Sequence, residues 1–107
     1  MQVFAEYAGK QFERRMLHDL RARFPAETQG VSDEQLVDRI RTGTEKAKCY
    51  GLNLQDHVRA YLELDITYGR DFDIREATGW AGRILRNHRL TAEAKLRALE
   101  DRQLFPG

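Results

Sequence analysis

The sequence predicts an all-α protein that forms a single compact domain of about five helices. Three observations support this class: apolar residues recur at helical spacing, capping residues, glycine and proline separate the periodic segments, and no segment alternates as a strand does. A chain of 107 residues is long enough for one core and too short for two. The predicted helices lie near residues 3–24, 33–50, 54–68, 79–87 and 92–103.

The first predicted helix has a wide apolar face and ends at Pro25. Between residues 3 and 24 an apolar residue recurs every three or four positions without a proline. Phe4, Tyr7 and Phe12 spread over a wider arc than one neighbouring helix covers. Packing in the core explains this arc, and so does contact with another protein. These three aromatic residues are therefore the first candidates for partner binding.

The second predicted helix has the clearest boundaries in the chain. Ser32 followed by Gln35 is the pattern of a capping box, and Gly51 follows the last apolar residue. Gly43 falls on the apolar face, where the missing side chain allows a second helix to approach closely. We expect a close helix crossing at this glycine.

The third predicted helix has an acidic residue within its apolar face. Asn53 is the expected cap, and the buried face is expected to begin at Leu54. At about 100° per residue, Asp65 projects among the apolar side chains, where an unpaired carboxylate is unfavourable. Asp65 is therefore expected to be a buried polar anchor, and a role in partner binding is the alternative. Its expected partner is Arg70, the Trp80 indole, a tyrosine hydroxyl or a helix amino terminus.

Threonines are the expected caps of the last two helices, Thr78 for the fourth and Thr91 for the fifth. A local basic cluster follows Thr78, and its members are Arg83, Arg86, His88 and Arg89. This cluster could contact phosphates, but acidic residues flank it and it does not form a recognisable recognition helix. A solvated helical face explains it better.

Asp71 and Asp73 form the one arrangement that could suggest a metal or catalytic site. A calcium loop needs more oxygen ligands and an acidic residue at its twelfth position, where this chain has Gly82. Salt bridges with Arg70 or Arg75, or helix capping, explain the two carboxylates better. We predict no metal site, and Arg70, Asp71 and Asp73 become the second candidates for partner binding.

The composition argues against several classes of function. With 18 basic and 17 acidic residues the formal charge is +1, so no overall field attracts nucleic acid or an anionic membrane. The single cysteine, Cys49, cannot form an internal disulfide, and the three histidines are isolated from one another and from nucleophiles. The eight glycines form no phosphate loop. These features predict a protein that is not an enzyme and needs no cofactor.

The sequence also predicts a cytoplasmic protein without a membrane segment. Gln2 and Glu6 interrupt the apolar run that a signal peptide needs, and no later segment is long enough to cross a bilayer.

Three segments indicate a family relationship: YLEL at 61–64, YGRDFD at 68–73, and Trp80-Ala81 with Ile84-Leu85. With Phe12-Glu13, Phe24-Pro25 and Tyr50-Gly51, they resemble a family of small all-helical bacterial proteins encoded beside type VI secretion effectors. The GRDFD run is the most specific part of the resemblance. The family often has an apolar residue in place of Asp65 and a Leu-Pro pair in place of Thr78 and Gly79, so this chain departs from the pattern there.

The resemblance implies a non-enzymatic adaptor or co-chaperone. Such proteins are thought to help a larger chaperone load a toxic effector onto a PAAR-tipped secretion spike, so the implied partner is a chaperone or an effector. An immunity protein that neutralises a cognate toxin is the alternative. Such a protein often blocks the toxin's active site with a strongly charged surface, and the near-zero net charge of this chain disfavours such a surface. An enzyme that uses Asp71 and Asp73 and a nucleic-acid binder that uses the basic cluster are weaker alternatives.

Overall fold

The computed structural model describes the backbone of residues 6–104 and the side chains of residues 10–103. The helices are α1 (Glu6–Arg23), α2 (Pro25–Thr28), α3 (Asp33–Cys49), α4 (Gln55–Tyr68), η1 (Glu76–Thr78, a 3-10 turn), α5 (Gly79–Leu85) and α6 (Ala92–Leu104). No described residue lies in a strand, which confirms the predicted all-α class. Five of the helices correspond to the predicted ones, and α2 is an additional single turn.

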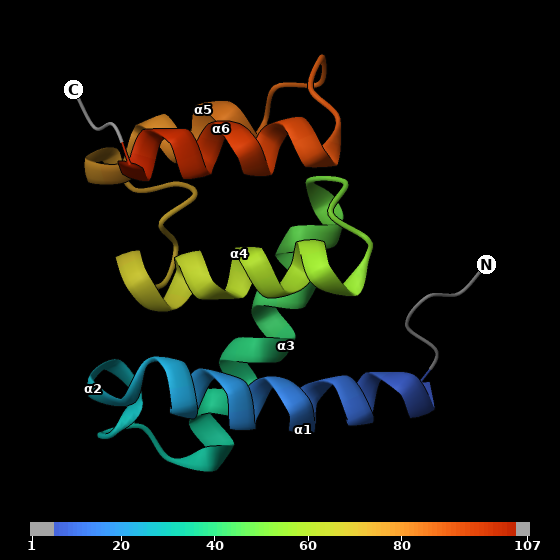
Figure 1. Cartoon of the computed structure of the whole chain (residues 1–107), viewed down its shortest axis with the longest axis vertical. Coiled ribbons are helices and arrows are strands. Elements are labelled where there is room, and N and C mark those ends of the chain that lie inside the picture. The colour runs from blue at the N-terminus through green and yellow to red at the C-terminus, as the bar shows by residue number, and fades with distance from the viewer. Residues whose placement is uncertain (1–5, 105–107) are drawn as a thin grey trace.

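The helices form a flat slab with α4 near its centre. The slab measures 36 × 35 × 20 Å along its principal axes. In Figure 1, α1, α4 and α6 run across the slab one above another, while α3 crosses α1 and α4. α3 packs against both α1 and α4, and α6 packs against α4 and α5. Helix α4 therefore joins the amino-terminal helices to the α5–α6 pair.

The core consists of apolar side chains that repeat at helical spacing. On α1, Phe12, Met16 and Leu20 are four residues apart and almost fully buried, so α1 presents one continuous stripe to α3 and α4. In the segment after α4, Phe72 is fully buried and its ring centroid lies 5.1 Å from that of Tyr61. This aromatic contact fixes the segment 69–75 against the core.

Two predicted helix starts and one predicted close contact are confirmed. The Ser32 hydroxyl accepts a hydrogen bond from the Gln35 amide, and the Gln35 side chain accepts one from the Ser32 amide, both at 3.1 Å. The Thr91 hydroxyl accepts a bond from the amide three residues later. A Cβ added at Gly43 would lie 2.5 Å from Cδ2 of Leu62, so the missing side chain lets α3 and α4 pack closely.

Other predictions about helix ends are wrong. The N-cap of α4 is Leu54 rather than Asn53, and Leu54 is 54% exposed because it precedes the first turn and leaves the buried face. The Thr78 hydroxyl does not cap α5; it donates to the Phe72 carbonyl at 2.5 Å and so fastens the preceding loop. Pro25 follows the end of α1 and also begins α2, since proline fits the first position of a helix.

Candidate functional site

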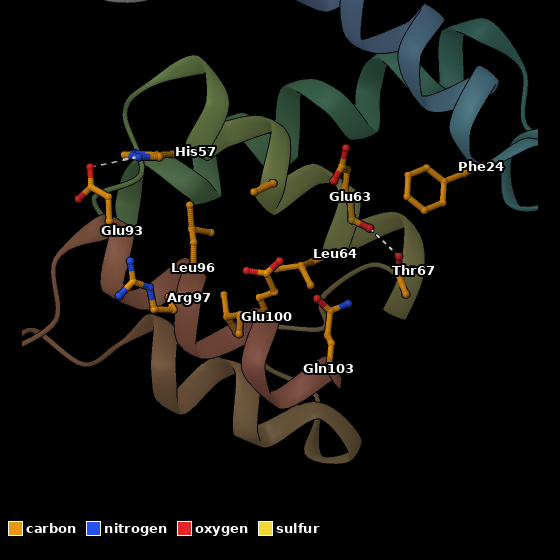
Figure 2. A pocket seen from close by; sticks show the side chains of 12 residues that line it. Phe24, His57, Glu63, Leu64, Thr67, Glu93, Leu96, Arg97, Glu100 and Gln103 are labelled. Carbon is orange, nitrogen blue, oxygen red and sulfur yellow. Dashed lines mark hydrogen bonds and ion pairs between the residues drawn. The ribbon is translucent and has the colours of Figure 1, made fainter. Parts of the chain in front are cut away.

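A groove of about 570 Å³ lies between α4 and α6 (Figure 2). This volume is in the range of about 300–1,000 Å³ that is typical of binding sites. Most lining residues come from the facing sides of the two helices, and Phe24, between α1 and α2, lies at one end. Residues more than 40 positions apart in the chain thus share one surface.

The floor of the groove is apolar. Ala60 and Leu64 are one helical turn apart on α4, and Leu96 and Leu99 are one turn apart on α6. Leu64 and Leu99 are buried, whereas Ala60 and Leu96 are half-buried and remain in part accessible. Figure 2 shows Leu64 and Leu96 directed into the space between their helices. The two helices therefore contact each other only along part of their facing surfaces.

The rim of the groove is mainly acidic. Glu63 on α4 and Glu93 and Glu100 on α6 line it, against one arginine, Arg97. His57 Nε2 lies 3.4 Å from a Glu93 carboxylate oxygen and links the two helices at one end (Figure 2). Glu93 and Glu100 are exposed, so their charges are available to a ligand.

One rim carboxylate already has a partner within the chain. Arg23 donates to Glu63 at 2.5 Å, which joins the end of α1 to the wall of the groove. Both side chains keep contact with solvent, so this ion pair contributes little to stability. Glu63 and Phe24 both line this end of the groove (Figure 2).

The groove has the composition of a binding surface. Among the described residues, no group of three or more His, Cys, Asp or Glu side chains could hold a metal ion. Within residues 10–103, His57 makes no hydrogen bond to a hydroxyl or a thiol, and the Thr67 hydroxyl donates to the Glu63 carbonyl of its own helix. The described residues of the groove thus provide apolar contact and charge, and no activated nucleophile.

The predicted aromatic candidates on the first helix do not form an accessible surface in the described part of the chain. Phe12 is 4% exposed and belongs to the core, so core packing accounts for it. Phe4 and the side chain of Tyr7 lie outside the described residues. Of the three predicted contact residues on this helix, the one with a described side chain, Phe12, is buried.

Side chains of α3 and of its last turn hold two of the loop candidates, Asp71 and Asp73. Lys46 donates to Asp71 at 2.7 Å and to Asp73 at 3.1 Å, and the Tyr50 hydroxyl donates to Asp73 at 2.6 Å. Asp73 is 2% exposed, so its carboxylate holds the loop in place and is not available to a partner. The prediction that Asp73 contacts a partner is therefore wrong. The expected partners of the two carboxylates were arginines of the same loop, but Lys46 takes that role.

The same contacts shift the ionisation of the groups involved. The hydrogen bond and charge of Lys46 hold the pKa of Asp71 below its usual value of 3.8. Burial and the hydrogen bond to Asp73 raise the pKa of Tyr50 to about 12. Arg70, the remaining loop candidate, is exposed and pairs with Asp38 at 3.2 Å.

Asp65 lies in the interior, 7% exposed, on the face of α4 that packs on α3. Its carboxylate accepts a hydrogen bond from Arg39 Nη2 at 3.1 Å, and its backbone carbonyl accepts one from the same nitrogen at 3.0 Å. Burial raises the pKa of Asp65 more than the nearby Arg39 lowers it. The partner is an arginine, which was one of the expected kinds of donor, but it is Arg39 of α3 and not Arg70. The packing of α3 against α4 brings Arg39 to this position.

No family model, curated protein or solved structure matches this chain. In the part of the chain that the structure describes, no helix is both long and apolar enough to cross a membrane. The α4–α6 groove, with its apolar floor and acidic rim, is the candidate functional site of the described chain.

Proposed function

We propose that this chain is a non-enzymatic accessory protein that binds an amphipathic helix of another protein in the α4–α6 groove. The groove itself is the observation that supports this function. It leaves Ala60 and Leu96 in part accessible between two helices, in a space that other described side chains do not fill. An apolar groove between helices is a common receptor for an amphipathic helix, which inserts residues spaced three or four apart.

The charge of the rim indicates the kind of helix that fits. Arg23 already pairs with Glu63, so Glu93 and Glu100 are the rim carboxylates that can face a helix with lysine or arginine beside its apolar face. Glu93 and Glu100 are two turns apart on α6 and can contact basic residues at similar spacing. Such pairs at the rim favour encounter and orientation more than they add affinity.

The resemblance of the sequence to proteins encoded beside type VI secretion effectors supports an adaptor or co-chaperone role. The partner in this proposal is an effector or the chaperone that loads it, and the site of action is the bacterial cytoplasm. Binding without chemistry agrees with a groove that has an apolar floor and charged edges.

The proposal is tested with purified protein and the purified products of the neighbouring genes. Leu96→Asp places a charge on the apolar floor and should weaken binding on the order of tenfold or more, as the loss of a central apolar contact does. Glu100→Lys reverses one rim charge and should slow association. Glu45→Lys is the matched control, because Glu45 is exposed on α3 and does not line the groove. Affinity is measured by calorimetry, and circular dichroism checks that each variant is folded.

Two results would contradict the proposal. If the folded Leu96 and Glu100 variants both bind as the wild type does, the interface lies elsewhere on the slab. If the protein binds only an isolated toxin domain and abolishes its activity, the chain acts as an immunity protein and the adaptor role is wrong.

A further inference from the structure

A second pocket, of about 440 Å³, lies where the end of α3 meets the end of α5 and the first turns of α6. It shares no lining residue with the α4–α6 groove. Three of its lining side chains are basic, namely Arg86, His88 and Lys95, and none of its lining residues is acidic. The chain as a whole has nearly equal numbers of acidic and basic residues, so the lining of this pocket is more basic than the protein as a whole.

Lys95 is the central feature of this pocket. The residue is only 7% exposed, and lysine is seldom buried unless an acidic partner balances its charge. Its ammonium donates to the Tyr50 carbonyl at 2.8 Å, but no described carboxylate lies within salt-bridge distance. The Tyr50 carbonyl is at the carboxyl end of α3, where the helix dipole supplies about half a negative charge. The pocket therefore contains a nearly buried ammonium whose described hydrogen-bond partner is a backbone carbonyl and not a carboxylate.

Arg86 adds a second full positive charge in a fixed position. Its Nη1 donates to the Asp73 backbone carbonyl at 3.0 Å, which holds the guanidinium at the end of α5. The Asp73 carboxylate does not line the pocket and accepts hydrogen bonds from Lys46 and the Tyr50 hydroxyl. His88 contributes an imidazole N–H to the same pocket.

We infer that the pocket around Lys95 binds a small ligand through a phosphate group. Two fixed positive charges match a phosphate dianion better than a single carboxylate. A bound dianion would also balance the charge that the fold leaves on the buried ammonium. The volume exceeds that of a bare ion, so the pocket has room for the remainder of a small phosphorylated molecule.

The test is a titration of the full chain with inorganic phosphate at constant ionic strength. Binding is monitored through the NMR amide signals of the nitrogen-15-labelled protein. Signals of Tyr50, Gly51 and Lys95 should shift and saturate. Lys95→Met removes the central charge and should weaken binding on the order of tenfold, the effect of losing one charged hydrogen bond. Arg83→Gln is the matched control, since Arg83 is an exposed basic residue of α5 outside the pocket, and it should bind as the wild type does.

A second variant and a second anion complete the test. If Lys95→Met does not fold, Arg86→Gln, a change at an exposed position, decides the matter and should weaken binding at least severalfold. Succinate at the same ionic strength should bind more weakly than phosphate. Shifts that do not saturate, or equal binding by wild type and the pocket variants, would overturn the inference, and equal binding of succinate would overturn the choice of phosphate. None of these results depends on the α4–α6 groove, so this inference and the proposed function fail independently.

Discussion

Replacement of Asp65 by alanine should destabilise the fold, because it leaves Arg39 partly buried without its carboxylate. The two side chains are 10% and 19% exposed, respectively, and Arg39 Nη2 binds both the carboxylate and the backbone carbonyl of residue 65. Arg39 Nε is buried and has no hydrogen-bond partner among the described residues. The arginine therefore depends on this one nitrogen for its contacts with Asp65.

The expected loss is about 1–3 kcal/mol, the range for a buried hydrogen bond that involves charged groups. Two effects keep it below the larger losses seen when a fully buried ion pair is broken. The backbone carbonyl remains as an acceptor for Arg39 in the alanine variant. Burial also raises the pKa of Asp65, which shows that the charged carboxylate is itself unfavourable in this position, and its removal relieves that penalty.

Urea unfolding followed by circular dichroism measures this loss as a shift of the midpoint with an unchanged slope. Asp56→Ala is the matched control, since Asp56 is on the same helix with 84% of its side chain exposed and should change stability by no more than about 0.5 kcal/mol. The double change of Asp65 to leucine and Arg39 to methionine should recover most of the stability, because both partners of the pair are then replaced by apolar groups. An unchanged midpoint for Asp65→Ala, or a double variant less stable than the single one, would refute this reasoning.

Three further predictions concern the contacts between α3, the loop after α4 and α5. Lys46 lowers the pKa of Asp71, so the ion pair stabilises the fold above pH 3.8, and this contribution is lost as the pH falls. In the Asp71→Asn variant the free energy of unfolding should therefore fall less steeply as the pH is lowered. Gly82→Ala would place a Cβ 2.2 Å from the Asp73 carbonyl oxygen, and calorimetric melting should show a loss of about 1–3 kcal/mol. Ultraviolet titration should give Tyr50 a pKa of about 12, and the Tyr50→Phe variant should lack this transition.

The sequence predicts the helices well because their signals are local. The capping box at Ser32 and the threonine at Thr91 lie within one turn of the helix that they begin, and both act as expected. Leu54 and Thr78 show the limit of such reasoning. A local rule fits both positions. In the folded chain, however, Leu54 is exposed, and the Thr78 hydroxyl donates to the carbonyl of Phe72 in the preceding loop.

The candidate site could not be predicted in the same way, because it depends on how helices far apart in the sequence are placed. Leu64 and Leu99 are recognisable as core residues from their spacing, but the sequence does not show that α4 and α6 leave a groove beside them. The same holds for Lys46, which binds loop carboxylates 25 and 27 positions later in the chain. Phe12 illustrates the opposite error, in which an aromatic residue of the core was taken for a partner contact.

The incomplete packing between α4 and α6 has a consequence for the motions of the free protein. A boundary with few buried contacts opens at a lower free energy than the whole domain unfolds. We therefore expect amide hydrogens of α6 to exchange with solvent faster than those of α3 and α4, which meet closely at Gly43. A helix bound in the groove would close this boundary and slow exchange in α6, while α3 would keep its rate. Hydrogen exchange can thus locate the bound partner without any substitution in the chain.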